Sequence, residues 1–244
     1  MTAGRHTCYA AHRVDLRESR LRKLIALLAA ERPGRLLDVG CAAGELAAEA
    51  IARGWRVDGM EREPALAEAA RALGVAVHVG DFDGGRWPWP SAAFDAAVAG
   101  EVIEHLVDTD QFLAELARVV RPGGALIVTT PNLASLENRV RLLLGRYPMW
   151  MDHRVEGAGH LRYYTPRVLK TQLQAHGFRV ERHVGNWVPL VPQRWADDRR
   201  FPWLAVTGDW FPSLAMGILM KARRGGQTGE PSSPPVPDSH RSAS

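Results

Sequence analysis

In the stretch LLDVGCAAGEL, residues 36–46, a short apolar run stops at a glycine and a helical pattern follows. The pattern predicts a strand over 36–39, a turn at Gly40 and a helix over 44–53. Glycines at 40 and 44 leave space that side chains would otherwise occupy, so the backbone there can approach a ligand closely. A glycine turn alone suits a dinucleotide, another ligand or simple packing. The stretch therefore predicts a strand–turn–helix unit and leaves its ligand open.

Short β-rich runs and helical patterns alternate on both sides of this stretch. The expected strands are 36–39, 55–60, 75–79, 94–99, 125–130, 178–187 and 213–223. The expected helices are 14–31, 44–53, 64–73, 108–120, which Pro122-Gly123-Gly124 would close, and one that Thr165-Pro166 caps and that ends near Gly177. Such alternation is typical of an α/β fold with a mostly parallel sheet covered by helices on both faces. The length of 244 residues suits one such domain, expected over 1–224.

Carboxylates stand at the ends of four successive expected strands, at Asp38, Glu61, Asp81 and Glu101. Open α/β sheets bind ligands outside the carboxyl ends of their strands, so these groups would surround one crevice. Glu61 is placed where a carboxylate can accept hydrogen bonds from both hydroxyls of a ribose. A dinucleotide normally needs the tighter G-x-G-x-x-G spacing, which Ala42 interrupts. A ring of carboxylates suits a cation, and S-adenosylmethionine, with its sulfonium and ammonium but no phosphate, fits it.

Six features follow one another along the chain: LLDVGCAAGELA (36–47), Glu61, GDF (80–82), WPWPSAAFD (87–95), GEVIEHL (100–106) and RPGGALIVTTPN (121–132). In these features the chain resembles the class I S-adenosylmethionine-dependent methyltransferases, particularly the ubiquinone-biosynthesis-like and related small-molecule branches, over 36–223. The resemblance implies a Rossmann-like, doubly wound, mostly parallel seven-stranded sheet with an antiparallel final strand. It also implies an enzyme whose cofactor is S-adenosylmethionine.

The resemblance assigns a role to each candidate residue of the cofactor site. The methionine end would be lined by Asp38, Gly40, Cys41 and Gly44, the ribose bound by Glu61, the adenine by Asp81 and Phe82, and the sulfonium underlain by Gly100 and Glu101. The family pattern often has glycine where this chain has Ala42. The alternative interpretation is structural, with glycines serving turns and carboxylates capping helices.

Catalysis of methyl transfer needs little beyond alignment and desolvation, because the sulfonium is already a strong electrophile. If the acceptor is a hydroxyl, a histidine near the methyl group can remove its proton. The candidates are His105, His153 and His160, of which His105 and His160 are the predicted catalytic residues.

Glu101, Glu104 and His105 are spaced so that one helical turn would place all three on one face. With His160 they resemble the metal site of small-RNA 2′-O-methyltransferases, in which a divalent ion would lower the pKa of the acceptor hydroxyl. The simpler interpretation, which assigns no metal, is that Glu101 serves the cofactor while Glu104 and His105 cap the next helix. We adopt the simpler interpretation and leave the metal as an alternative.

Two segments are expected to set the acceptor. Residues 131–163 are irregular in pattern and suit a lid or substrate loop, and the motif GHLRYYTP (159–166) resembles a segment of one branch of these enzymes. His160 and Arg162 face the substrate in one interpretation and pack or pair at the surface in the other. Residues 187–212 form an insertion rich in tryptophan, proline and arginine, which suits a membrane interface, a lipid-linked substrate, a cap over the sheet or a dimer contact.

Composition limits the remaining function classes. The net charge of +4 is spread along the chain without a basic block, which argues against nucleic acid. Residues 1–13 lack an apolar core typical of a signal peptide, and one of the two cysteines, Cys41, lies in the glycine turn, so a cytoplasmic protein without a disulfide is expected. Residues 225–244 have the composition of a disordered tail. The alternatives to a small-molecule methyltransferase are a metal-dependent RNA 2′-O-methyltransferase and a non-catalytic scaffold; the acceptor and the oligomeric state stay open.

Overall fold

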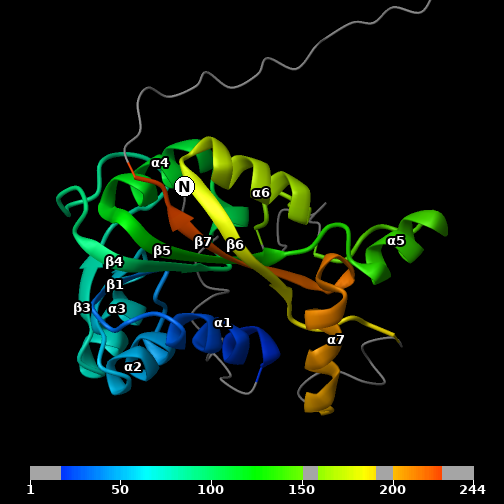
Figure 1. Ribbon diagram of the computed structural model, residues 1–244, viewed down its shortest axis with the longest axis horizontal. Coiled ribbons are helices and arrows are strands. Elements are labelled where there is room, and N and C mark those ends of the chain that lie inside the picture. Colours follow the sequence, from blue (N-terminus) through cyan, green and yellow to red (C-terminus); the bar gives the residue numbers. More distant parts are fainter. Residues whose placement is uncertain (1–17, 151–158, 191–199, 227–244) are drawn as a thin grey trace, which may run out of the picture.

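The computed structural model describes residues 18–150, 159–190 and 200–226, and these build a helix–sheet–helix sandwich (Figure 1). Its seven-stranded sheet has the order β3-β2-β1-β4-β5-β7-β6. The strands are β1 (Arg35–Val39), β2 (Arg56–Glu61), β3 (Ala76–Val79), β4 (Phe94–Gly100), β5 (Val120–Pro131), β6 (Phe178–Gly185) and β7 (Gly217–Arg224). The predicted Rossmann-like α/β fold is confirmed.

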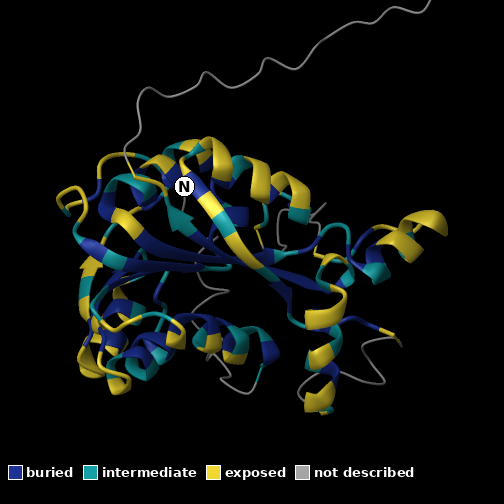
Figure 2. Cartoon of the chain, viewed as in Figure 1, coloured by how far each residue is buried: buried dark blue, intermediate teal, exposed yellow. Residues whose placement is uncertain are grey.

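Helices cover both faces of the sheet. They are α1 (Ser19–Ala29), α2 (Glu45–Ala52), α3 (Pro64–Ala72), α4 (Thr109–Val119), α5 (Leu136–Leu143), α6 (Pro166–Ala175) and α7 (Ala205–Trp210). One apolar cluster joins α4 and α6 to the strands and a second joins α1, α2 and α3 to the opposite face. The inner strands β1, β4 and β7 are mostly buried, while the edge strands β3 and β6 are largely not (Figure 2). The core is therefore two apolar layers separated by the sheet.

Strand direction places the candidate site. β1 pairs in parallel with β2 and β4, β2 with β3, and β4 with β5, so these strands end at one edge of the sheet. β7 is antiparallel to both β5 and β6, as expected for the final strand. The strand order reverses between β1 and β4, and a reversal of this kind opens a crevice at the carboxyl ends of the strands. Asp38 in β1 lies beside Gly59 in β2, and Val98 in β4 lies on its other side.

Several boundaries differ from the predictions. The expected helix 14–31 is Ser19–Ala29, with 14–17 outside the described residues. Both last strands are shorter than expected: β6 ends at Gly185, and β7 begins only at Gly217 because Pro212–Leu214 forms a 3₁₀ turn. The expected closure of a helix by Pro122-Gly123-Gly124 is wrong. The helix α4 ends at Val119 and these three residues lie in the irregular start of β5, where the register against β4 shifts.

The largest difference is α5, which lies in the segment expected to be irregular. Ser135 caps it by accepting a hydrogen bond from the Asn138 N–H at 3.3 Å. Asn138 is its one buried residue, while Leu142 and Leu143 are exposed. An inward apolar stripe, on which the prediction of a helix depends, is therefore missing here. In the described ranges, no helix has both the length and the apolarity needed to cross a bilayer.

Lys23 of α1 fastens the insertion between β6 and β7 to the body of the domain. Its ammonium donates to the Gly185 carbonyl at 2.7 Å, to the Ala205 carbonyl at 2.5 Å and to Asp209 at 2.9 Å. We expect Lys23→Met to lower the free energy of unfolding by about 2 kcal/mol, because a lost donor leaves partly buried acceptors unsatisfied. Thermal melts should show a Tm lower by roughly 4–8 °C. The exposed Lys170 gives the control Lys170→Met, and an equal Tm for the two variants would contradict the anchoring role.

Candidate active site

The turn between β1 and α2 is held against the end of β2. Gly40 and Cys41 donate their backbone N–H groups to the Met60 carbonyl at 2.8 and 3.2 Å. Gly40 and Gly44 have φ values of 71° and 87°, in the left-handed region that glycine favours. A Cβ on Gly40 would lie 2.6 Å from Val102, and one on Gly44 would lie 2.9 Å from Ala70. The glycines are thus required by backbone conformation and by packing against the protein, as in the structural interpretation, and their role toward a ligand stays a prediction.

Asp38 and Glu61 meet beneath this turn. Glu61 is 8% exposed and its carboxylate accepts from the backbone N–H groups of Ala42 at 2.9 Å, Arg62 at 2.8 Å and Glu63 at 2.9 Å. Asp38 is 3% exposed, and its Oδ2 has no hydrogen-bond partner among the described residues. Burial, then the charges of Glu61 and Glu45, raises the pKa of Asp38 to about 7. A buried carboxylate in this condition gains from a cationic ligand, which would supply both a counter-charge and a donor.

Cys41 belongs to the core beneath the turn. Its thiol is buried with α2 and β2 residues, and burial raises the pKa of the thiol, with Asp38 and Glu61 adding to the effect. A Cβ on Gly59 would lie 2.7 Å from the Cys41 sulfur, so β2 needs a glycine opposite it. The side chain therefore packs in the interior, and contact with a ligand over the turn is left to the backbone of Cys41.

The segment after β3 carries the residues expected at the adenine. Asp81 is exposed and accepts from Arg62 at 2.9 Å and from the Asp83 N–H at 2.9 Å. Phe82 is 9% exposed, and the Arg62 guanidinium lies 4.9 Å from the centre of its ring. Arg62 follows Glu61 directly, so one chain segment links the expected ribose and adenine positions.

The end of β4 has a strained residue. Glu101 has φ of 57°, which is rare for a side chain of this size and concentrates at functional sites. It is held from both sides by Thr129 of β5: the Glu101 N–H donates to the Thr129 carbonyl at 3.0 Å, and Thr129 Oγ1 donates to Glu101 Oε1 at 2.8 Å. Gly100 lies beside it, where a Cβ would stand 3.7 Å from Leu24 and Thr129.

The 3₁₀ turn η1 (Ile103–His105) follows and contains a buried carboxylate and a histidine. Glu104 is 1% exposed; its Oε2 accepts from Thr130 Oγ1 at 3.0 Å, and its Oε1 has no hydrogen-bond partner among the described residues. Burial, then the charge of Glu101, holds the pKa of Glu104 well above its usual range. Burial, then the nearby His160, lowers the pKa of His105, which favours the neutral imidazole.

The expectation that Glu101, Glu104 and His105 share a helical face is wrong. Glu101 has a left-handed backbone and precedes a single 3₁₀ turn, so the three residues do not lie on one face of a helix. Instead, Glu104, His105 and His160 each offer one ligand atom, and these atoms lie within 4.8 Å of one another. The imidazole rings of His105 and His160 have centroids 4.8 Å apart. His153, also a candidate, lies outside the described residues.

The segment 159–163 is fixed to η1 by its backbone. The N–H groups of Leu161 and Arg162 both donate to the Glu104 carbonyl, at 2.7 and 3.0 Å. His105 Nδ1 lies 3.3 Å from the Gly159 carbonyl and His160 Nδ1 lies 2.7 Å from the Trp150 carbonyl. A carbonyl can only accept, so each Nδ1 carries a proton, and in the neutral form of each ring the lone pair lies on Nε2. Arg162 donates to the Val107 carbonyl.

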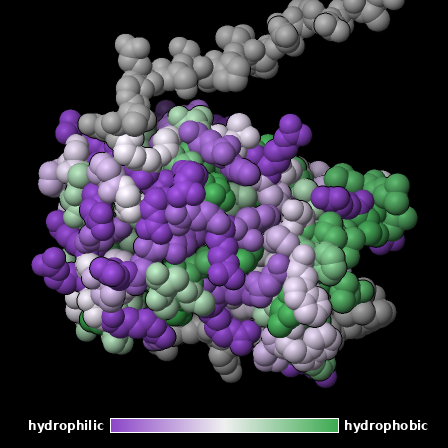
Figure 3. Space-filling model, viewed as in Figure 1, coloured by the Kyte–Doolittle hydropathy of each residue, from purple (hydrophilic) through white to green (hydrophobic). Residues whose placement is uncertain are grey.

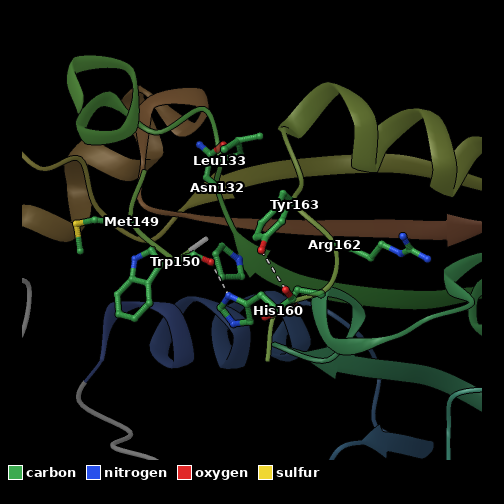
Figure 4. Close-up of a pocket in the computed structure, with 9 residues that line it drawn as sticks. Asn132, Leu133, Met149, Trp150, His160, Arg162 and Tyr163 are labelled. Carbon is green, nitrogen blue, oxygen red and sulfur yellow. Dashed lines mark hydrogen bonds between the residues drawn. The ribbon is translucent and has the colours of Figure 1, made fainter. Parts of the chain in front are cut away.

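A small pocket opens beside these histidines (Figure 4). It is lined by Glu104, Pro131, Asn132, Leu133, Met149, Trp150, His160, Arg162 and Tyr163. Tyr163 donates its hydroxyl to the His160 carbonyl at 3.1 Å, which holds the segment 159–163 in shape at the pocket. Sequence reasoning missed Thr129, Thr130 and Asn132, although they stand together at the end of β5 in the motif TTPN, where the strand-end rule already pointed.

Comparison with known proteins agrees with this geometry. A family model described as a methyltransferase domain matches residues 11–183. A malonyl-[acyl-carrier protein] O-methyltransferase of Serratia marcescens is 32% identical over 166 residues, which cover 67% of this chain and 59% of that protein. A ubiquinone biosynthesis O-methyltransferase of Rhizobium etli is 26% identical over 169 residues, covering 66% of each. The chain thus spans less than two thirds of the length of these relatives.

Solved structures agree on the fold. A structure titled as an S-adenosylmethionine-dependent methyltransferase of Thermotoga maritima, 20% identical, superposes with a TM-score of 0.65 over 85% of this chain and 90% of that one. The family match covers most of the chain, from before α1 into β6. The glycine turn, the buried Asp38 and Glu61 and the reversal of strand order all lie inside that match. The chain therefore belongs to the class I S-adenosylmethionine-dependent methyltransferases.

Proposed function

We propose that this chain transfers a methyl group from S-adenosylmethionine to the hydroxyl oxygen of a small-molecule acceptor. The observation that carries the proposal is the pair His105 and His160, whose Nδ1 atoms are fixed by carbonyls while their Nε2 atoms hold the lone pairs. His105 lies in η1, which follows β4, the strand that pairs with β1 beside Asp38, and the segment 159–163 brings His160 next to it. A general base is useful for a hydroxyl, whose proton must leave, which favours oxygen as the acceptor atom.

The proposed site has one half that binds the cofactor and one half that binds the acceptor. Asp38 and the glycine turn are proposed to bind the methionine end of the cofactor, Glu61 the ribose, and Phe82 with Asp81 the adenine. When bound, S-adenosylmethionine supplies the electrophilic methyl group and leaves as S-adenosylhomocysteine. His160 lines the acceptor pocket and is proposed to take the hydroxyl proton on Nε2, with His105 packed beside it. Neutral His105 avoids a second positive charge next to that proton.

The segment 131–163 is proposed to be the lid that selects the acceptor. Leu133, Met149, Trp150 and Tyr163 give the pocket an apolar and aromatic lining. Such a lining suits a flat or aliphatic hydroxyl compound better than a highly charged one. The spread positive charge and this lining make RNA a poor fit as acceptor. We also propose a cytoplasmic location, because the position of Cys41 in the glycine turn makes a structural disulfide an unsuitable assignment and a reducing compartment a suitable one.

A metal-assisted version of the reaction is the second candidate, and one observation favours it. Glu104 is buried with an oxygen that has no partner among the described residues, and its ligand atom lies within 4.8 Å of those of His105 and His160. Carboxylate and imidazole ligands are shared by several divalent ions. An ion held there would lower the pKa of the acceptor hydroxyl and orient it, and would offset the cost of burying the Glu104 charge.

The test combines binding and transfer. Purified protein is titrated with S-adenosylmethionine and S-adenosylhomocysteine in a calorimeter, and transfer of a radiolabelled methyl group is then measured on catechols, hydroxybenzoates and the corresponding amines. Binding of both ligands with transfer to the hydroxyl compounds is expected. No binding of either ligand would overturn the proposal. Activity that is lost on chelation and restored by Mg²⁺ or Mn²⁺ would establish the metal-assisted version.

Cofactor affinity should depend on pH through Asp38. The pKa of this carboxyl is about 7 without ligand, and a cation favours the ionised form. Below pH 7 a proton must be released on binding, so the affinity for S-adenosylmethionine should fall about tenfold for each pH unit, and it should level off above pH 8. Titration between pH 5.5 and pH 8 measures this. Asp38→Asn should bind weakly with no such slope; the same slope in that variant would assign it to another group.

A further inference from the structure

Helix α5 presents apolar side chains to solvent. Leu143 is 86% exposed, the highest value among the exposed large apolar residues. We call apolar rim the exposed apolar side chains of two neighbouring parts: α5 with the residues that follow it, and the 3₁₀ turn η2 (Pro202–Leu204) with α7 and the residue after α7. They are Val140, Leu142, Leu143, Leu144, Tyr147, Trp150, Trp203, Val206, Trp210 and Phe211. Figure 3 shows hydrophobic surface gathered over α5, which projects from the body of the molecule in Figure 1. Single exposed apolar residues are ordinary, but a gathering of this size marks a surface that binds something apolar.

The two parts of the rim are joined by a buried contact. Met149, which follows α5, packs with Phe201 against the cluster of Trp187, Leu204 and Met216. Asn138 brackets Met149, accepting from its N–H at 2.7 Å and donating to its carbonyl at 3.4 Å. The helix is thus attached through a polar residue and a methionine, and its leucines are left facing outward. A fixed helix that buries an asparagine and exposes leucines is oriented for an apolar partner.

The charges of the described segments at the rim are positive on balance, which suits an anionic surface. Described residues 133–150 and 200–214 contain four arginines, Arg139, Arg141, Arg146 and Arg200, and two carboxylates. Both carboxylates are paired: Glu137 with Arg141 at 3.0 Å and Asp209 with Lys23 at 2.9 Å. The apolar groups of the rim and these arginines match the headgroup region of an anionic bilayer. The leucines can insert, the indole and phenol rings can lie at the boundary, and the arginines beside them can bind the anionic headgroups. A second copy of the chain would bring the same arginines face to face.

We propose that the apolar rim docks the protein on an anionic lipid bilayer, with α5 and α7 lying in the headgroup region. Trp150 belongs both to the rim and to the lining of the pocket next to His160. The pocket therefore stands at the edge of the docking surface. If the proposed function holds, on which this last step rests, a hydroxyl acceptor dissolved in the bilayer reaches the pocket without crossing water.

Co-sedimentation with vesicles tests the docking without any need for activity. Full-length protein is spun with vesicles of phosphatidylcholine alone and of phosphatidylcholine mixed with phosphatidylglycerol, at low and high salt. Binding to the mixed vesicles is expected, weaker at high salt and weaker on phosphatidylcholine. The double variant Leu143→Glu with Trp210→Glu should lose at least about tenfold in apparent affinity, because two inserting groups become charged. Leu73→Glu, at an exposed leucine that ends α3, is the matched control and should bind like the wild type.

A second variant, Arg139→Glu with Arg146→Glu, keeps the leucines and should lose binding only to the anionic vesicles. Each variant is first shown to bind S-adenosylhomocysteine like the wild type, so a failure of docking and a failure of the proposed function are seen separately. Absence of wild-type binding to every vesicle, or equal binding by all variants, would overturn the proposal. A wild-type dimer that the Leu143→Glu and Trp210→Glu variant converts to a monomer would instead show that the rim is a protein–protein interface.

Discussion

Replacing His160 by asparagine is expected to lower kcat for hydroxyl acceptors by about 10²–10⁴-fold, the usual contribution of a general base. Asparagine places an amide N–H close to the position of Nδ1, so the contact with the Trp150 carbonyl can persist while the Nε2 lone pair is lost. The affinity for S-adenosylhomocysteine should stay unchanged, because His160 lines the acceptor pocket rather than the glycine turn. Steady-state transfer assays and calorimetry measure the two quantities.

His176 provides the matched control for this variant. It lies at the end of α6 and contacts Asp110 through Nε2 at 2.9 Å, outside the pocket lining. His176→Asn should leave kcat unchanged. Wild-type turnover in His160→Asn would mean that alignment alone drives the reaction and that the histidine pair is structural. A loss of kcat that follows chelation of the wild type would assign His160 to an ion rather than to the proton.

Replacing Glu61 by alanine is expected to weaken S-adenosylmethionine binding by about 10²–10⁴-fold. Two charged hydrogen bonds to ribose hydroxyls, each contributing about 1.5–3 kcal/mol, account for a loss of this size. The Ala42 N–H also loses its acceptor, so the glycine turn loses one of its contacts with β2 and keeps those of Gly40 and Cys41 with the Met60 carbonyl. Calorimetric titration measures the effect, and thermal melts report whether the fold survives.

Two further variants separate ligand binding from turn geometry. Glu61→Gln keeps the shape and one acceptor oxygen, so it should lose less affinity than Glu61→Ala. Glu63→Ala removes a neighbouring carboxylate that makes no capping hydrogen bond at α3 and should bind normally. Equal affinities for wild type and Glu61→Ala would contradict the ribose assignment.

The sequence predicted the layout of the sheet because that layout depends on short-range patterns. Short β-rich runs of four to six residues, each followed by a glycine or a carboxylate, predicted β1, β2 and β4, and their parallel pairing then followed from the intervening helices. The same rule brought Asp38 and Glu61 together under the turn, as expected for groups at the ends of neighbouring parallel strands.

Glu101, α5 and the approach of His160 to His105 depend on contacts that local sequence patterns do not reveal. The left-handed backbone of Glu101 is imposed by Thr129 on the adjacent strand, and no spacing rule for a helix anticipates it. Helix α5 has no inward apolar stripe and is held by Asn138, so the usual periodicity was absent. His160 reaches His105 because two backbone N–H groups bind the Glu104 carbonyl, a contact between segments more than fifty residues apart in sequence. The roles of these residues in catalysis stay predictions.

The antiparallel direction of β7 has a consequence for how such a protein can diversify. Pro131, the last residue of β5, pairs with Gly217, the first residue of β7, and the Asn132 N–H donates to the Met216 carbonyl at 2.8 Å. The chain before β7 therefore emerges at the same edge of the sheet as the chain after β5. A parallel β7 would have sent that insertion to the opposite edge. We therefore expect that the loop after β5 and the insertion before β7 can be replaced together, in evolution or in a chimera, without changing the cofactor site at the first four strands.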